Sequence, residues 1–268
     1  MIDSYWQLVL IGIGAADGLL MVLYLLQRRT GDATLVDAGW GTAIAVQAAI
    51  YGALGPGRVE HRALIASAAG IESLRVAWVV VRRVGQGEDS RYRELRERWR
   101  SRGREQLSFF VFYHAQAMLA VVLSAPVLLA CFNRNHGLEP VEWAGAALWL
   151  FAVTAESVAD RQLRLFKADP ANRGRTMRSG LWRYSRHPNY FFQWLTWIAY
   201  GLIAVAAPWG WIGFVSAPLI LYLILFVTGI PPSEEQALKR RADYADYQRE
   251  TSAFVPLPPR KRELLSRA

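Results

Sequence analysis

The chain has 268 residues, of which 53% are hydrophobic and 20% charged, and its formal net charge is +9 at pH 7. That average would suit a basic soluble protein, but the apolar residues are gathered in uncharged runs about as long as the roughly 20 residues that cross a bilayer. The single cysteine, Cys131, has no partner in the chain, which excludes an internal disulfide and a cysteine-based metal site.

Seven apolar stretches are predicted to be transmembrane helices. In chain order they cover residues 4–26, 33–55, 61–83, 107–131, 138–158, 188–207 and 209–230. Pro208 and Gly210 must form a tight turn if the last two are separate, and one long broken helix is the alternative. The predicted fold is an all-α integral membrane domain over residues 1–268.

The charges of the loops predict an orientation. With the N-terminus outside, the outer loops hold only Arg58, Arg62 and Arg134, whereas the inner loops and the C-terminal tail hold 27 of the 31 Lys and Arg residues. This asymmetry follows the positive-inside rule and favours an odd number of spans. We therefore expect a cytosolic C-terminal tail and a first helix that stays as an uncleaved signal anchor.

The basic residues of the inner loops could indicate nucleic-acid binding. Their role in setting membrane topology and their attraction to anionic lipid head groups explain most of them instead. Two segments contain more than positive charge. Residues 87–100 mix acids and bases in a helical pattern, and residues 183–191 place two Arg, a His, an Asn and two Tyr where a span begins. Because guanidinium groups bind phosphate and aromatic rings stack on a flat base, these segments predict a nucleotide-like ligand.

Polar residues inside the predicted spans or at their ends are functional candidates because they are expensive to place in lipid. They are Asp37, Glu72, Arg75, Tyr113, His114, Gln116, Glu156, Asp160, Asn189 and Gln193. All lie in the inner half of their spans, which predicts one polar cavity open to the cytosol. The structural alternatives are a Glu72–Arg75 ion pair, helix packing by His114 and a cap at Asp37.

Motifs across most of the chain resemble one family. RYSRHPNYFFQW (183–194), preceded by DRQLRLFK (160–167) and RSGLW (178–182), resembles the C-terminal signature of the steroid 5α-reductase family. Its bacterial branch is similar to LVDAGWG (35–41), EDSRYRELRERW (88–99), GIPPSEE (229–235) and DYADYQRETSAFVP (243–256). The Arg-His-Pro-Asn-Tyr string is also shared with sterol reductases and isoprenylcysteine methyltransferases.

The resemblance implies a seven-span enzyme of a bacterial inner membrane that binds NADPH from the cytosolic side. Its implied reaction is reduction of the enone C=C bond of a lipid such as a 3-oxo-Δ4 steroid, which enters from the bilayer. The positions that match the family's cofactor site are Arg75, Glu156 (where the family has Asn), Asp160, Arg164, Lys167, Arg178, Asn189, Tyr247 and Arg249, with Tyr244 close by. The predicted cofactor residues from the two mixed segments are Arg91, Tyr92, Tyr184, Arg186, His187 and Tyr190.

The match to the family's catalytic residues is poorer. The animal enzymes use a tyrosine one turn before the arginine that Arg75 matches, and the position here is Glu72. A carboxyl that stays protonated can donate to a carbonyl as a phenol does, so the predicted catalytic residues are Glu72, Asp37 and Tyr113. No metal, nucleic acid or obligatory protein partner is predicted.

Two other functions stay open. A membrane methyltransferase of the isoprenylcysteine type would bind S-adenosylmethionine, which carries no phosphate, and the many arginines favour NADPH over it. A transporter or scaffold would need polar groups in the outer half of the spans, where the sequence offers few.

Overall fold

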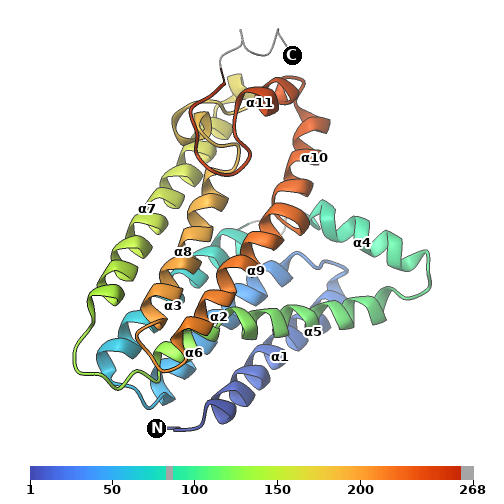
Figure 1. The fold of residues 1–268 in the computed structure, drawn as a ribbon. Helices are drawn as coiled ribbons and strands as arrows, with labels where there is room; N and C mark the ends of the chain where they lie inside the picture. Colours follow the sequence, from blue (N-terminus) through green and yellow to red (C-terminus); the bar gives the residue numbers. More distant parts are fainter. Residues whose placement is uncertain (83–86, 261–268) are drawn as a thin grey trace. The chain divides into compact units, whose positions relative to one another are not determined.

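The computed structural model describes residues 1–82 and 87–260, and within these ranges every regular element is a helix (Figure 1). The longer helices are α1 (Tyr5–Thr30), α2 (Leu35–Leu54), α3 (Val59–Val81), α4 (Ser90–Arg100), α5 (Glu105–Leu123), α7 (Pro140–Ala168), α8 (Pro188–Ala204) and α10 (Ile230–Arg240). The shorter elements are α6 (Ala125–Ala130), α9 (Ser216–Tyr222), α11 (Tyr244–Glu250), a π-helical turn (Leu223–Val227) and three 3₁₀ turns (Pro170–Asn172, Gly180–Arg183 and Gly210–Val215).

The prediction of an all-α membrane protein is confirmed in its coarse form. Helices occupy each predicted apolar stretch. In the described part of the chain, four segments are long and apolar enough to cross a membrane: Tyr5–Thr30, Val59–Val81, Glu105–Ala130 and Gly210–Arg240. The helix α8 has 17 residues, which is shorter than the roughly 20 that a full span needs. These helices give the chain the character of a multi-pass membrane protein.

The turn between the last two apolar helices is tight, as the Pro208–Gly210 prediction requires. The helix α8 ends at Ala204, and Trp209 then adopts a left-handed backbone with φ 61°. A Cβ atom on Gly210 would lie 1.8 Å from the carbonyl oxygen of Ala204, so only glycine fits there. The chain therefore forms two helices here and not one broken helix.

The described chain divides into two compact units. Unit 1 comprises residues 1–146 and 200–216, and unit 2 comprises residues 147–199 and 217–260. In unit 1, small residues bring α1, α2 and α3 close together. A Cβ on Gly12 would meet the Tyr51 hydroxyl at 2.0 Å, and one on Gly52 would meet Ala66 Cβ at 2.8 Å. Such close approach is typical of helices packed in membranes.

A buried histidine and a buried glutamate join the start of α3 to the start of α7. His61 Nδ1 lies 2.6 Å from Glu142 Oε1, and both side chains are fully buried. His61 Nε2 lies 3.1 Å from the carbonyl oxygen of Asn135. These bonds hold residues 131–139 against the start of α3, so this pair has a structural role.

In unit 2 the C-terminal segment folds back on the loop before α8. The backbone amide of Arg186 donates to the Ser252 carbonyl at 2.8 Å, and Ser185 Oγ donates to the Phe254 carbonyl at 2.7 Å. The Leu257 amide donates to the Tyr184 carbonyl at 2.9 Å. Residues 251–257, here called the tail strap, thus hold residues 184–187 in place.

Candidate functional site

Polar residues of unit 2 gather around the carboxylate of Glu234 on α10. Its Oε1 accepts from Arg186 Nε at 2.7 Å and lies 3.2 Å from His187 Nε2, while its Oε2 accepts from Gln248 at 2.7 Å. Arg186 also donates to the carbonyl oxygens of Gln248 and Thr251 at 3.0 and 2.6 Å. The Arg186 side chain is only 11% exposed, and its bonds hold α10 and α11 against the loop before α8.

Aromatic residues complete this Glu234 cluster. The rings of His187 and Tyr190 are stacked, with centroids 5.3 Å apart and planes 5° from parallel. The Tyr190 hydroxyl lies 3.2 Å from Ser233 Oγ, and the Tyr244 hydroxyl donates to Glu234 at 3.4 Å. The structure therefore brings the predicted residues Arg186, His187, Tyr190 and Tyr244 together, and their partners in it are protein groups.

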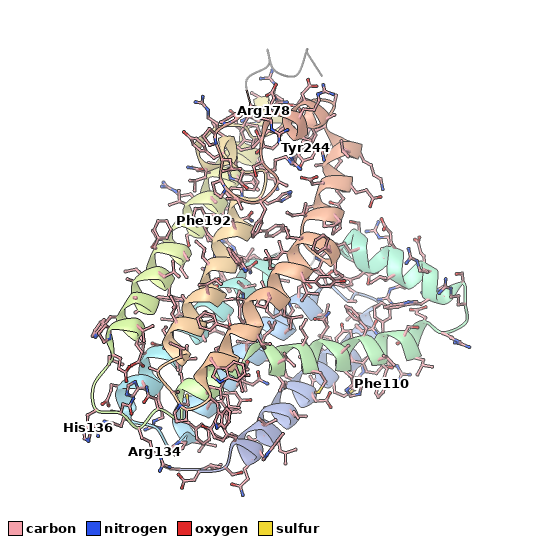
Figure 2. All side chains as sticks on the ribbon, viewed as in Figure 1. Phe110, Arg134, His136, Arg178, Phe192 and Tyr244 are labelled. Atoms are coloured by element: carbon pink, nitrogen blue, oxygen red, sulfur yellow. The ribbon has the colours of Figure 1, made fainter. Side chains whose placement is uncertain are left out.

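A second set of contacts surrounds Arg178. Figure 2 shows Arg178 and Tyr244 near each other, with Phe192 of α8 farther away. Arg178 donates to the Asp243 carbonyl at 2.6 Å and to Glu250 at 3.2 Å, and its guanidinium lies 5.5 Å from the Tyr247 ring centroid. These contacts hold α11 against the loop at 176–186.

Two groups beside Arg178 have shifted pKa values. Burial raises the pKa of Tyr247, with the neighbouring Tyr244 adding to the shift, so the Tyr247 hydroxyl is a hydrogen-bond donor to the carbonyl oxygens of Trp182 and Ser185. Burial alone would raise the pKa of Asp243. Hydrogen bonds from the hydroxyl and the amide of Thr176, at 2.6 and 3.1 Å, lower it instead.

The helix α7 continues past the predicted end at residue 158 and carries the next candidates. Asp160 accepts from Asn189 Nδ2 at 3.2 Å, so the two predicted residues meet. Asn189 Oδ1 is buried and accepts no hydrogen bond from any described residue. Glu156 is buried one turn before Asp160. A buried amide oxygen without a donor is unusual and marks a place where a ligand can donate.

The other predicted cofactor residues of unit 2 lie at its surface. Arg164 and Lys167 are exposed on the last turns of α7, and Tyr184 is 43% exposed. Arg249 is also exposed and pairs with Asp246. Between residues 161 and 183, five exposed arginines have no ion pair with any described residue: Arg161, Arg164, Arg173, Arg175 and Arg183.

In unit 1, α4 is attached to the start of α2 through Asp37. Asp37 Oδ2 accepts from Arg91 Nη2 at 2.7 Å, and the Tyr92 hydroxyl donates to Asp37 Oδ1. Burial alone would lower the pKa of Arg91, but its bond to Asp89 and the charge of Asp37 raise it. Burial, then Asp37, raise the pKa of Tyr92. Asp37, Arg91 and Tyr92 are therefore brought together as a structural anchor.

A buried arginine that the sequence reasoning missed strengthens the same attachment. Arg96 Nη2 donates to Glu88 at 2.8 Å and to Gln27 at 3.1 Å, while Nη1 donates to Glu105 at 2.7 Å. Arg96 has only 7% of its surface exposed. The mixture of acids and bases in residues 87–100 was the sequence signal for Arg96. The structure shows that Arg91, Tyr92 and Arg96 of this segment bond to other residues of the chain.

The predicted catalytic residues have different surroundings. Both carboxylate oxygens of Glu72 accept from Arg75, at 2.9 and 2.8 Å, which is the bidentate geometry of a guanidinium–carboxylate pair. Tyr113 is fully buried, and its hydroxyl has no hydrogen-bond partner among the described residues. No hydrogen bond joins any two of Glu72, Asp37 and Tyr113 in the part of the chain that the structure describes.

Two further acids were missed by sequence reasoning. Glu234 follows a double proline at the start of α10, a position that reads as a simple helix start. Asp17 lies in the middle of α1 and pairs with His114 of α5. A lone acid inside an apolar run was a signal for Asp17. Glu234 lies in the GIPPSEE motif (229–235), but that motif did not indicate which side chains it contacts.

The profile of a family described as a protein of unknown function, DUF1295, matches residues 23–251. The chain belongs to the DUF1295 family. The match includes the Asp37 anchor, the Asp160–Asn189 pair and the Glu234 cluster. No match was found among curated proteins, and none among solved structures.

Proposed function

We propose that this DUF1295 protein is an NADPH-dependent oxidoreductase that reduces the enone C=C bond of a membrane lipid such as a 3-oxo-Δ4 steroid. The observation that carries the proposal is the Asp160–Asn189 pair with its buried Asn189 Oδ1, which accepts no hydrogen bond from the described chain. An amide oxygen in that state suits an N–H donor, and the carboxamide of a nicotinamide is one.

The charges of unit 2 fit the phosphates of such a cofactor. Arg164 on α7 and Arg173 and Arg183 in the loop after it are exposed and have no ion pair with a described residue. Guanidinium groups of this kind bind phosphate bidentately. Arg178 and Arg186 are instead engaged with protein groups, so their proposed role is to position the loop that carries Asn189.

When bound, NADPH would supply a hydride for the β-carbon of the enone. For the proton, Tyr113 is a better candidate than Glu72. The Tyr113 hydroxyl is buried without a partner, whereas the carboxylate of Glu72 is held by Arg75. A phenol in that state can donate to a ketone oxygen and stabilise the charge that develops there.

We further propose seven membrane spans, with the N-terminus outside and the cofactor side facing the cytosol of a bacterial inner membrane. The support is the helix that occupies each apolar stretch and the distribution of 27 of the 31 basic residues on one side. The three additional spans would be α2, α7 and α8.

Direct binding to purified protein in lipid nanodiscs tests the cofactor. We expect calorimetry to detect NADPH and not S-adenosylmethionine. Arg164→Ala should weaken NADPH binding roughly tenfold because it removes one charge-assisted hydrogen bond. Arg28→Ala is the matched control, since Arg28 is an exposed arginine of α1 in unit 1. Binding of S-adenosylmethionine with none of NADPH would replace this proposal by the methyltransferase.

A further inference from the structure

A polar pair in unit 1 lies in the middle of two apolar helices, outside the candidate site. His114 Nδ1 is hydrogen-bonded to Asp17 Oδ1, and both side chains are 34% exposed. Asp17 is the 13th of the 26 residues of α1, so it lies about 18 Å from either end of the helix. Ionisable groups at this depth are expensive unless something polar covers them.

Each member of this pair keeps one unused polar atom. Asp17 Oδ2 and His114 Nε2 have no hydrogen-bond partner among the described residues. A carboxyl oxygen accepts, and the second ring nitrogen donates when it carries a proton. The outward face of the pair thus offers one acceptor and one donor, and an identical pair that faces it has the complementary arrangement.

The surface around Asp17 allows another helix to come close. Gly14 and Gly18 are exposed on α1, and a Cβ on either would meet nothing within 4 Å. They are four residues apart, the G-x-x-x-G spacing at which two membrane helices bring their backbones together. Leu10 and Val22 continue this face and are 66% and 63% exposed. A flexible lipid tail needs no such flat surface.

We propose that this face of unit 1 is where two copies of the chain meet in the membrane. About a two-fold axis, His114 Nε2 of each copy donates to Asp17 Oδ2 of the other, and the α1 helices cross at Gly14 and Gly18. Such an interface is self-complementary, as two-fold symmetry requires. It satisfies both polar groups at a depth where water is absent. The proposal does not depend on the cofactor.

The first test counts copies in vesicles. Ser101 is exposed and Cys131 is buried, so Ser101→Cys gives one site for a fluorescent label. We expect two photobleaching steps per particle, with energy transfer that falls as lipid is added. Gly14→Leu and Gly18→Leu should give single copies because they block the close approach. Gly70→Leu is the matched control, since Gly70 on α3 also has open space around it.

The second test asks whether Asp17 and His114 pair between copies. Asp17→Leu and His114→Leu should each weaken association, because a cross-pair loses its acceptor or its donor. Random pairing of an equal mixture gives twice as many mixed dimers as either pure dimer. The restored cross-pair should raise that ratio about threefold further, to roughly sixfold. Thermal unfolding checks that both variants fold. Single copies at every lipid ratio, a polar lipid bound to single copies, or no preference in the mixture would overturn the proposal.

Discussion

The hydroxyl of Tyr113 offers a test at the scale of one atom. It is fully buried and has no hydrogen-bond partner among the described residues, so Tyr113→Phe removes no bond. We expect the change in unfolding free energy to stay within about 0.5 kcal/mol, because an unsatisfied hydroxyl contributes little. If Tyr113 supplies the proton, turnover should fall by about 10²-fold or more.

The measurements for Tyr113→Phe are thermal unfolding in detergent and NADPH oxidation with an enone substrate. Tyr24→Phe is the control. It removes the hydrogen bond from the Tyr24 hydroxyl to the Gln106 carbonyl at 3.3 Å, so it should lower stability and leave turnover unchanged. Full turnover in Tyr113→Phe would show that another group supplies the proton.

The hydrogen bonds of Asp243 predict a pH dependence. Thr176 lowers the pKa of this carboxyl below its ordinary value of 3.8, so the charged form stabilises the folded state. That stabilisation is present above pH 3.8 and is lost as the pH falls through the lower folded pKa. Acid should therefore loosen α11 from residues 176–178, and Asp243→Asn should remove this step. Hydrogen exchange of α11 between pH 5 and about pH 2 measures it.

At the scale of elements, the attachment of α4 depends on Arg96. This side chain has carboxylates of Glu88 and Glu105 on either side, and 8% of it is exposed. Arg96→Leu leaves both carboxylates without their buried cation, which costs about 3–5 kcal/mol. We expect trypsin to cleave within residues 90–100 of this variant far faster than in the parent chain.

The control for that experiment is Arg98→Leu, because Arg98 is exposed on the same helix and makes no ion pair with a described residue. Protection of α4 from trypsin that is equal in both variants would show that Asp37 alone holds the helix. The bonds from Arg91 and Tyr92 to Asp37 are the remaining attachment in that case.

The helices could be predicted from sequence better than the contacts between them. Long uncharged runs predict helices because backbone groups must bond internally in lipid, and the turn at Gly210 had a local glycine signal. The partners of Asp37 and Arg186 had no such signal. Their bonds join residues that are 54 and 48 positions apart, which only the packed chain brings together. Asp37 and Arg186 were expected to face a ligand, but in the structure they bond to protein groups and hold loops and helices in place.

At the scale of the whole molecule, the proposed topology predicts which loops a reagent reaches from each side. His136 and Arg173 are exposed in loops on opposite sides of the proposed membrane. In intact cells, a membrane-impermeant thiol reagent should label His136→Cys and leave Arg173→Cys unlabelled until the cells are permeabilised. Ser101→Cys should behave as Arg173→Cys does. Labelling of all three from outside would contradict the orientation.

The tail strap also sets an order of events during synthesis. Ser185 bonds to the carbonyl of Phe254, which follows it by 69 residues. At about 5–20 residues per second, the ribosome takes roughly 3–14 s to make that stretch. Through this interval the Arg186 amide and the Tyr184 carbonyl, which the strap later bonds, need water as their partner. A loop inside hydrocarbon has no water to hydrate it, so a strap that is made so late can close only over a loop that lies outside the lipid.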